Sequence, residues 1–296
     1  MNKAKLFYNP NAGSSSYQPG DIISIVESKG YDCISVSVKE KGWDTIEEDI
    51  DFIIVSGGDG TIRKVCTFLL NNKKGHLPIG VLPMGTANNI ASTLHITGTV
   101  TDIISSWNAN TIQTYDVGKI RFADKSYFFF ESFGYGLFPY FFKKADKNKL
   151  PEVETPEQSI FHALKKLEQL IPHFDALQNK ITADDKDISG NFFLVEVMLA
   201  QHIGPRITLA HDSEMNDGFF DLIVLSSKQK EMLGTYVSDR LNAKEDHVRF
   251  SFTKTKKVLI QSQSNLIHID DGVIDILPGT EIKVKILSEA LRFFKV

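Results

Sequence analysis

A buried apolar run that ends in a glycine-rich turn is the feature that most constrains this chain. Phe52–Ser56 is apolar up to its last residue, which is typical of a central parallel strand covered on both faces. It leads into Gly57-Gly58-Asp59-Gly60-Thr61, and a helical pattern follows over Thr61–Leu70. The same alternation predicts strands at Lys5–Tyr8, Cys33–Val38 and Pro78–Leu82, and helices at Asp21–Lys29 and Thr86–Leu94. Residues 1–116 are therefore predicted to form a doubly wound parallel sheet.

Three turns rich in Gly, Asn or Ser follow strands of this sheet, at Asn9–Ser16, Gly57–Thr61 and Leu82–Asn89. Ligands of such sheets bind beyond the carboxyl ends of the strands, where these turns lie. Glycines let a phosphate approach backbone N–H groups at a helix N-terminus. Asp59 would hold a Mg²⁺ water network or act as a base, and Thr86 would be the N-cap of the next helix. The turns together predict a nucleotide-phosphate site, although each alone is also compatible with a capped turn.

Composition narrows the function classes further. The chain has 296 residues, which suggests two domains, and its net charge of −4 makes it a poor candidate for binding nucleic acid. Cys33 and Cys66 lie in apolar stretches without metal-ligand spacing, so we expect buried, reduced thiols and a cytoplasmic location. No apolar run reaches the roughly 18–20 residues of a membrane-spanning helix, and no signal peptide or transmembrane segment is expected.

The pattern changes after Tyr115, where strands separated by turns replace the alternation. Expected strands are Ile112–Arg121, Ser126–Gly134, Gly190–Gln201, Phe219–Leu225, Val248–Thr253, Lys257–Gln261, Leu266–Asp270 and Glu281–Leu287. Helices are expected at Pro156–Ile171, with Thr155 as N-cap, and at Lys228–Asn242. Residues 117–288 are therefore predicted to be an antiparallel β-sandwich domain, with a segment of about 289–296 packing back on the first domain.

The ordered motifs resemble those of the diacylglycerol kinase catalytic family, which includes soluble bacterial lipid kinases and sphingosine and ceramide kinases. The resemblance rests on Asn9-Pro10…Gly13, Gly57-Gly58-Asp59-Gly60-Thr61, Leu82-Pro83-Met84-Gly85-Thr86-Ala87-Asn88, Asp217-Gly218-Phe219-Phe220-Asp221-Leu222 and Ile269-Asp270-Asp271-Gly272. It spans nearly the whole chain. NAD kinases share the Gly-Gly-Asp-Gly-Thr string, whereas the loop around Met84 favours the lipid kinases.

This resemblance implies a cytoplasmic kinase, peripheral at the inner membrane face, that transfers the γ-phosphate of ATP to a hydroxyl of diacylglycerol or of a sphingoid or ceramide-like lipid. It implies ATP in an interdomain cleft and lipid on the sandwich domain, and it leaves a homodimer open. Asp59 and Asp271 would be catalytic, and Asp217 would bind a structural Mg²⁺. The nucleotide-binding residues it implies are Asn9, Pro10, Gly13, Gly57, Gly58, Asp59, Gly60, Thr61, Gly85, Thr86 and Asn88.

Three positions depart from the family pattern. Val273 stands where the family has the Glu assigned as proton acceptor, Asn89 replaces an Asp, and Val38 replaces a nucleotide-contacting Thr. Asp271 or Asp270 could then be the base. Two other hypotheses stay open: a catalytically impaired member that binds lipid or nucleotide, and an NAD-kinase-like phosphotransferase.

An aromatic stretch follows the domain boundary, with ten aromatic residues within Tyr127–Phe142. Phe128–Phe133 alternates as a sandwich-core strand would. Leu137–Lys144 is predicted to be a helix with Phe138, Phe141 and Phe142 close together and two lysines at its end. These three residues are predicted to bind the lipid, either at an acyl-chain mouth or on a membrane-facing patch.

Overall fold

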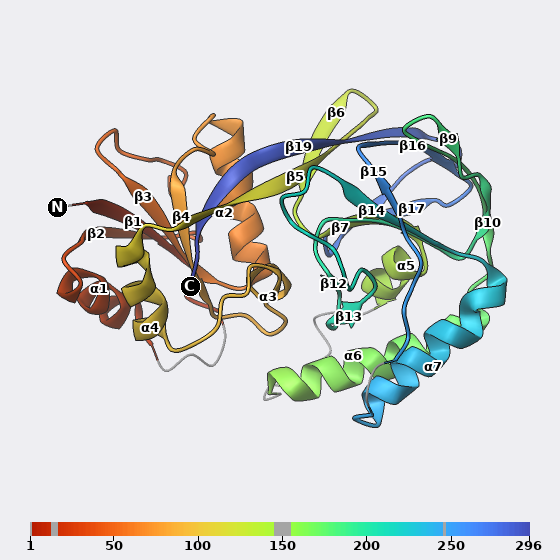
Figure 1. Ribbon diagram of the computed structural model, residues 1–296, viewed down its shortest axis with the longest axis horizontal. Helices are drawn as coiled ribbons and strands as arrows, with labels where there is room; N and C mark the ends of the chain where they lie inside the picture. The colour runs from red at the N-terminus through yellow and green to blue at the C-terminus, as the bar shows by residue number, and fades with distance from the viewer. Residues whose placement is uncertain (1, 13–16, 145–154, 245–246) are drawn as a thin grey trace. The chain divides into compact units, whose positions relative to one another are not determined.

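The computed structural model describes residues 2–12, 17–144, 155–244 and 247–296 (Figure 1). It divides into two units. The first is Met1–Asp116 together with Ser288–Val296, and the second is Val117–Leu287. We describe each unit by itself.

A parallel sheet forms the centre of the first unit, in the order β2-β1-β3-β4. Its strands are β1 (Lys3–Tyr8), β2 (Asp32–Ser37), β3 (Phe52–Gly57) and β4 (Pro78–Pro83). Every residue of β3 is buried, as the apolar run predicts. The last part of β19 (Glu281–Phe294) pairs in parallel with β4, with Arg292 opposite Pro78. The parallel α/β part of the predicted fold class is confirmed.

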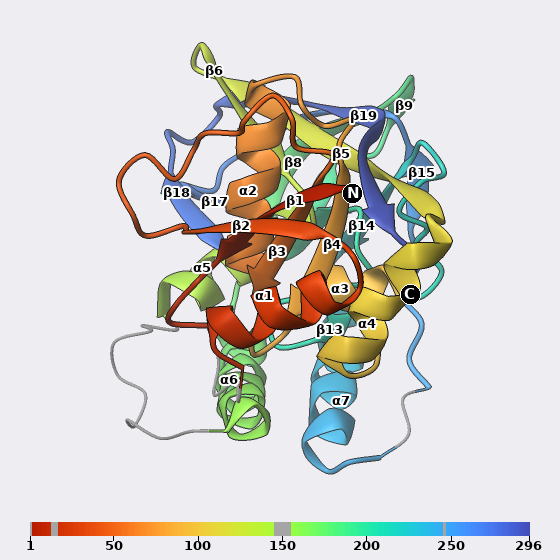
Figure 2. The same ribbon diagram turned by 90° about the vertical axis from the view of Figure 1, so that its left-hand side faces the viewer.

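The helices of this unit are α1 (Pro19–Ser28), α2 (Asp59–Asn71), α3 (Asn89–Thr93), α4 (Val100–Ser106) and the short 3₁₀ helix η1 (Trp107–Ala109). Helix α1 packs on β2 and α4, and α2 packs on β3 and α3 (Figure 2). The predicted N-cap at Thr86 is wrong, because α3 begins at Asn89 and its N-cap is Asn88. The reason is the Asp59 carboxylate of another turn, which accepts the Asn89 and Ile90 N–H groups.

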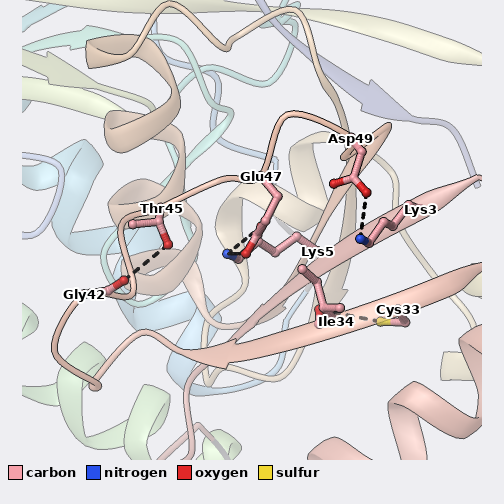
Figure 3. A network of polar contacts seen from close by, with 8 residues as sticks. All are labelled: Lys3, Lys5, Cys33, Ile34, Gly42, Thr45, Glu47 and Asp49. Atoms are coloured by element: carbon pink, nitrogen blue, oxygen red, sulfur yellow. Dashed lines mark hydrogen bonds and ion pairs between the residues drawn. The ribbon is translucent and has the colours of Figure 1, made fainter.

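An irregular segment, residues 38–51, joins β2 to β3 and is tied to β1 by two ion pairs (Figure 3). The buried Lys5 ammonium contacts both oxygens of Glu47 at 2.9 and 3.0 Å, and Lys3 contacts Asp49 at 2.8 Å. Trp43 of this segment packs edge-on against Phe7 of β1. The segment is therefore fixed against the sheet without regular secondary structure.

The second unit is built on two mainly antiparallel layers. One contains β5 (Ile112–Phe122), β6 (Lys125–Phe129), β8 (Leu177–Ala183), β9 (Lys186–Asp187), β10 (Gly190–Phe192), β16 (Lys257–Ser262) and the start of β19. The other runs β15-β14-β11-β7-β17-β18. Its strands are β7 (Ser132–Gly136), β11 (Leu194–Met198), β14 (Phe220–Leu225), β15 (Thr253–Thr255), β17 (Leu266–Ile269) and β18 (Gly272–Asp275). Apolar side chains of both sheets form one core between them, so the predicted sandwich is confirmed.

Helices cover the far side of the second sheet and enclose another core. They are α5 (Leu137–Lys144), α6 (Pro156–Leu170) and α7 (Lys230–Leu241), with the 3₁₀ turns η3 (Ile171–His173) and η4 (Ser227–Gln229). A two-stranded ribbon, β12 (His202–Ile203) and β13 (Ile207–Thr208), completes the unit. Thr155 caps α6 as predicted, by accepting the Gln158 N–H. None of the described helices is long and apolar enough to cross a membrane.

Some of the strands predicted for this unit are wrong. Val248–Thr253 is not a strand, since β15 begins only at Thr253. Phe250 is nevertheless buried, because it packs edge-on against Tyr236 of α7 rather than in a sheet. The run Ser126–Gly134 is interrupted at Phe130 and Glu131, whose backbone N–H groups bond to a carboxylate instead of a neighbouring strand.

The aromatic stretch is largely core. Phe129, Phe130 and Phe133 are buried, as predicted for a sandwich strand. Helix α5 forms as predicted, but Phe138 and Phe141 are 0% and 2% exposed. The membrane-facing patch is therefore wrong for these two residues, because α5 is packed between β7, β17 and α6 and presents them to that core. A role for Phe138, Phe141 and Phe142 in contacting an acyl chain stays a prediction.

Both cysteines are buried free thiols. Burial raises the pKa of the Cys33 thiol to about 12, with smaller contributions of the same sign from Glu27 and Asp32. A thiol with that pKa is protonated at neutral pH and is a poor nucleophile.

Candidate functional site

A cavity of about 410 Å³ lies in the first unit, among the turns that follow its parallel strands. Six of the predicted site residues line it: Asn9, Gly58, Gly60, Thr61, Gly85 and Thr86. The other lining residues are Asn11, Ala12, Val38, Lys39 and Lys64. Pro10, Gly57, Asp59 and Asn88 belong to the same turns without lining the cavity, and Gly13 lies outside the described residues.

Two glycine turns touch through their backbones at this cavity. A Cβ added to Gly85 would lie 2.4 Å from the Gly58 Cα, and one added to Gly58 would lie 2.8 Å from the Gly85 Cα. Both distances are shorter than any ordinary contact, so neither position has room for a side chain. The Met84 N–H also donates to the Gly57 carbonyl at 3.0 Å. The turns after β3 and β4 thus form one packed structure.

Asn88 shapes the turn after β4. Its backbone is left-handed, with φ of 52°, a conformation that Asn tolerates better than most residues. Its side-chain oxygen accepts the Gly85 N–H, and its side-chain amide donates to the Gly85 carbonyl, both at 2.9 Å. The turn is therefore closed on itself, with Gly85 held against Gly58.

Asp59, in the turn after β3, binds the N-terminus of α3. Its Oδ2 accepts the Asn89 N–H at 3.0 Å, and its Oδ1 accepts the Ile90 N–H at 2.9 Å. These are the N–H groups that a helix leaves without internal partners, and a carboxylate there is also favoured by the helix dipole. Asp59 thus positions the two turns relative to each other. Its predicted role as a base or in a Mg²⁺ network remains a prediction.

Lys64 and Lys39 add positive charge that the sequence reasoning missed. Lys64 stands on α2 four residues after Gly60, so helical spacing places it on the same face as the cavity-lining turn. Its ammonium donates to the Val38 carbonyl and lies 4.3 Å from the centre of the Trp43 ring. Backbone N–H groups at a helix start, combined with two ammonium groups, are suited to binding phosphate.

Asp217, the predicted Mg²⁺ ligand, lies in the second unit just before β14. Its Oδ1 accepts the Phe219 N–H at 2.9 Å, and its Oδ2 pairs with the Lys254 ammonium, which also lies 4.0 Å from Asp221. Burial raises the pKa of Asp221, and Lys254 acts in the opposite direction. Among the described side chains, no group of three or more His, Cys, Asp or Glu is placed to hold a metal ion. A Mg²⁺ ion at Asp217 would have to displace the Lys254 ammonium.

The turn between β17 and β18 carries the predicted base Asp271 and the alternative, Asp270. Asp270 is 6% exposed, and its Oδ1 accepts backbone N–H groups of Phe130, Glu131 and Ser132 at 3.0, 2.8 and 3.3 Å. This carboxylate closes the corner between β6 and β7, so it is not available as a base. Asp271 beside it is exposed, and Val273 lies opposite His268 in the β17–β18 pair.

A fully buried ion pair supports the same turn. The His268 Nε2 lies 2.8 and 2.9 Å from the two carboxylate oxygens of Glu196, and its Nδ1 contacts the Asp270 carbonyl. Although burial alone would lower the pKa of His268, the Glu196 carboxylate raises it above the ordinary value. The residues are 72 positions apart, and no sequence pattern connects them.

Comparison with known proteins shows which proteins this chain resembles. Residues 3–120 match the model of the diacylglycerol kinase catalytic domain. The chain is 24% identical to a diacylglycerol kinase of Staphylococcus saprophyticus, over 96% of this chain and 93% of that protein. It is 26% identical to one of Staphylococcus aureus, over 91% of this chain and 85% of that protein.

The fold has a solved counterpart. A crystal structure of a diacylglycerol kinase from Bacillus anthracis superposes with a TM-score of 0.74, covering 100% of this chain and 97% of that one at 19% identity. This likeness confirms the predicted fold over both units. The family-model match and the full-length relatives confirm the resemblance seen in the ordered motifs. Residues 3–120 are thus similar to the diacylglycerol kinase catalytic domain, and nearly the whole chain is similar to bacterial diacylglycerol kinases.

Proposed function

We propose that this protein is a lipid kinase that transfers the γ-phosphate of ATP to a hydroxyl of a lipid such as diacylglycerol or a sphingoid or ceramide-like lipid. The observation that carries the proposal is the cavity in the first unit, where two glycine turns, the start of α2 and two lysines converge. Such a site neutralises and orients phosphates, which is most of what phosphoryl transfer requires of a protein. Two relatives that are 24% and 26% identical to this chain are named diacylglycerol kinases, which supports the same reaction class.

Different residues of the cavity would have different roles in binding the nucleotide. Backbone N–H groups around Gly58 and Gly60 would hold the phosphates, with Lys64 and Lys39 as counter-charges and Asn9 and Thr86 as polar contacts. Mg²⁺ bound with the nucleotide would supply further charge neutralisation at the phosphates. Mg²⁺ commonly binds through substrate phosphates and only one or two carboxylates, so its binding would not require a carboxylate cluster.

The proton of the acceptor hydroxyl needs a base. We propose Asp271, which is exposed at the β17–β18 turn, because Val273 carries no proton acceptor and Asp270 is held by three backbone N–H groups. For the lipid chain we propose Phe138, Phe141 and Phe142. Since the first two are buried in the α5 core, an acyl chain would have to open that core. A kinase of this kind would work at the inner face of the cytoplasmic membrane.

A second candidate is a member of the family that binds nucleotide or lipid with little turnover. The observation that favours it is Val273, which removes the usual carboxylate from the turn that carries Asp271. Val273→Glu distinguishes the candidates. A large gain in rate would identify an impaired kinase, whereas an unchanged rate would place the base elsewhere.

The test of the proposal is Mg²⁺-dependent transfer of labelled γ-phosphate from ATP to a panel of lipids in mixed micelles. We expect the wild type to form a phosphorylated lipid, and Asp59→Ala to reduce the rate at least about a hundredfold, because the α3 N–H groups lose their acceptor and the turn moves. The matched control is Asp187→Ala, an exposed aspartate in the other unit, which should leave the rate unchanged. ATP binding without any lipid product would contradict the kinase proposal.

Replacing Lys64 tests whether its charge contributes to the affinity for ATP. Lys64→Met keeps an unbranched side chain and removes the ammonium that lies over the Trp43 ring, so we expect the dissociation constant for ATP to rise about tenfold, as for loss of one charge-assisted hydrogen bond. Lys41→Met, at an exposed lysine of the irregular segment 38–51, is the matched control. Isothermal titration calorimetry measures both. Equal affinities of the two variants would mean that Lys64 does not contact the nucleotide.

A further inference from the structure

A basic groove lies on the outer layer of the second unit, formed by β5, β6, β8, β16 and β19. Its volume is about 540 Å³. The lining residues are Lys119, Arg121, Ser126, Thr182, Asp184, Lys257, Val258, Leu259, Lys283, Val284 and Lys285. Figure 1 shows this layer along the top of the unit, with α6 and α7 at its bottom, so the groove is on the face opposite the helices.

The charge of the groove is almost entirely positive, in a chain whose net charge is −4. Its five cationic side chains face a single carboxylate, that of Asp184. This carboxylate accepts the backbone N–H groups of Lys256 and Lys257 at 3.0–3.2 Å. Lys283 pairs with Glu281 at 3.3 Å. Within the part of the chain that the structure describes, the other four cations, Lys119, Arg121, Lys257 and Lys285, have no ion pair.

The strand register places like charges together. Lys257 of β16 lies directly opposite Lys285 of β19 in an antiparallel pair. Like charges at directly opposed positions destabilise a sheet. An anion in the groove would relieve this repulsion, so the arrangement favours a bound ligand of negative charge.

One exposed apolar side chain lies between the cations. It is Leu259, which is 37% exposed and lies opposite Lys283, whereas Val258 and Val284 are 2% exposed and belong to the core between the sheets. Cations around the exposed Leu259 side chain match a molecule that joins a phosphate to an apolar part. A single-stranded nucleic acid would also use stacking on aromatic rings, and none lines the groove. A second copy of this chain would bring like charges together.

We propose that this groove binds the phosphate headgroup of an anionic phospholipid in a bilayer, with the glycerol and the first part of a chain over Leu259. The inference does not depend on the proposed kinase function, because none of its residues lines the cavity of the first unit. It assigns a lipid contact to this chain apart from the buried helix α5.

The experiment is co-sedimentation with vesicles of phosphatidylcholine alone and of phosphatidylcholine mixed with phosphatidylglycerol. The wild type should bind only the mixed vesicles, and less at high salt. In the triple variant Lys257→Glu/Lys283→Glu/Lys285→Glu the affinity should fall at least about a hundredfold, which is about fivefold for each lysine near an anionic surface. Because each Glu reverses the charge instead of only removing it, the hundredfold fall in affinity is a lower bound.

A matched triple variant controls for net charge. Lys41→Glu/Lys166→Glu/Lys228→Glu changes three exposed lysines outside the groove and should keep vesicle binding. Thermal melting monitored by circular dichroism checks that both variants fold. If the groove variant melts early, Lys257→Gln/Lys285→Gln replaces it, which removes the opposed charges and should still weaken binding at least about tenfold.

Three results would overturn the proposal. One is equal vesicle binding by the wild type and the folded groove variant. Another is loss of binding in the control variant, which would place the contact on another face. The third is groove-dependent binding of inorganic phosphate or of a single-stranded RNA without binding to vesicles, which would assign the groove to a soluble anion or to a nucleic acid.

Discussion

Replacing Glu196 by Gln should lower the free energy of unfolding by about 3–5 kcal/mol, because breaking a fully buried ion pair leaves the remaining charge without compensation. Glu196 and His268 are both 0% exposed, and they support the turn that holds Asp270 and Asp271. Urea denaturation measures the change. The exposed Glu281→Gln serves as the matched control and should alter stability little, since Glu281 pairs only with an exposed lysine.

The same pair predicts a pH dependence with a defined sign. Glu196 raises the pKa of His268 above its unfolded value of about 6.5, so the stability this provides is fully present below that pH. It is lost as the pH rises through the higher folded-state pKa. In Glu196→Gln the contribution of Glu196 is lost, while burial still lowers the pKa of His268 and Asp270 still raises it, so less stability should be lost as the pH rises. Two results would contradict this account: a free energy of unfolding within about 1 kcal/mol of the wild type, or the same change of that free energy with pH.

Gly85→Ala should raise the dissociation constant for ATP at least about a hundredfold, since about 2.7 kcal/mol is readily lost when a phosphate-binding turn is displaced. The added Cβ would lie 2.4 Å from the Gly58 Cα, so one of the two turns has to move. Calorimetry measures the affinity.

The control for this substitution is Gly234→Ala in α7, where an added Cβ meets nothing within 4 Å. It should leave ATP affinity unchanged and stabilise the protein by about 0.5–1 kcal/mol, because Ala is the better helix former. Wild-type ATP affinity in Gly85→Ala would show that the nucleotide does not depend on these turns.

The predictable part of the fold comes from local patterns. Phe52–Ser56 and Pro78–Leu82 are apolar runs with turn signals after them, and both form strands within one or two residues of the predicted ends. Thr155 with Gln158 is a local capping signal, and it defines the start of α6. The three turn motifs lie at the ends of parallel strands, which is enough to place them at one edge of the sheet.

The secondary-structure predictions fail where contacts between residues distant in sequence determine the local structure. The start of α3 could not be read at Thr86, because its N-terminal N–H groups are taken by Asp59 of another turn. Val248–Thr253 has a strand-like pattern, but the partner of Phe250 is the helical Tyr236.

The residues of the candidate site are likewise difficult to predict from local sequence patterns. Lys64 has only a weak local signal, its helical spacing from Gly60. The pairing of His268 with Glu196 had none, because it exists only through the β7, β11 and β17 arrangement. Likewise, Phe138 and Phe141 satisfy an amphipathic pattern equally well on a membrane surface and in a core. Only the position of α5 between β7, β17 and α6 decides for the core.

The most direct test of the central claim is a crystal structure of the full chain with Mg²⁺ and a non-hydrolysable ATP analogue. We predict the phosphates over the Gly58–Gly60 turn, within reach of Lys64 and Lys39, in the cavity after β1, β3 and β4. Nucleotide phosphates seated instead in the basic groove of the second unit, or no nucleotide bound under conditions that saturate related kinases, would contradict it.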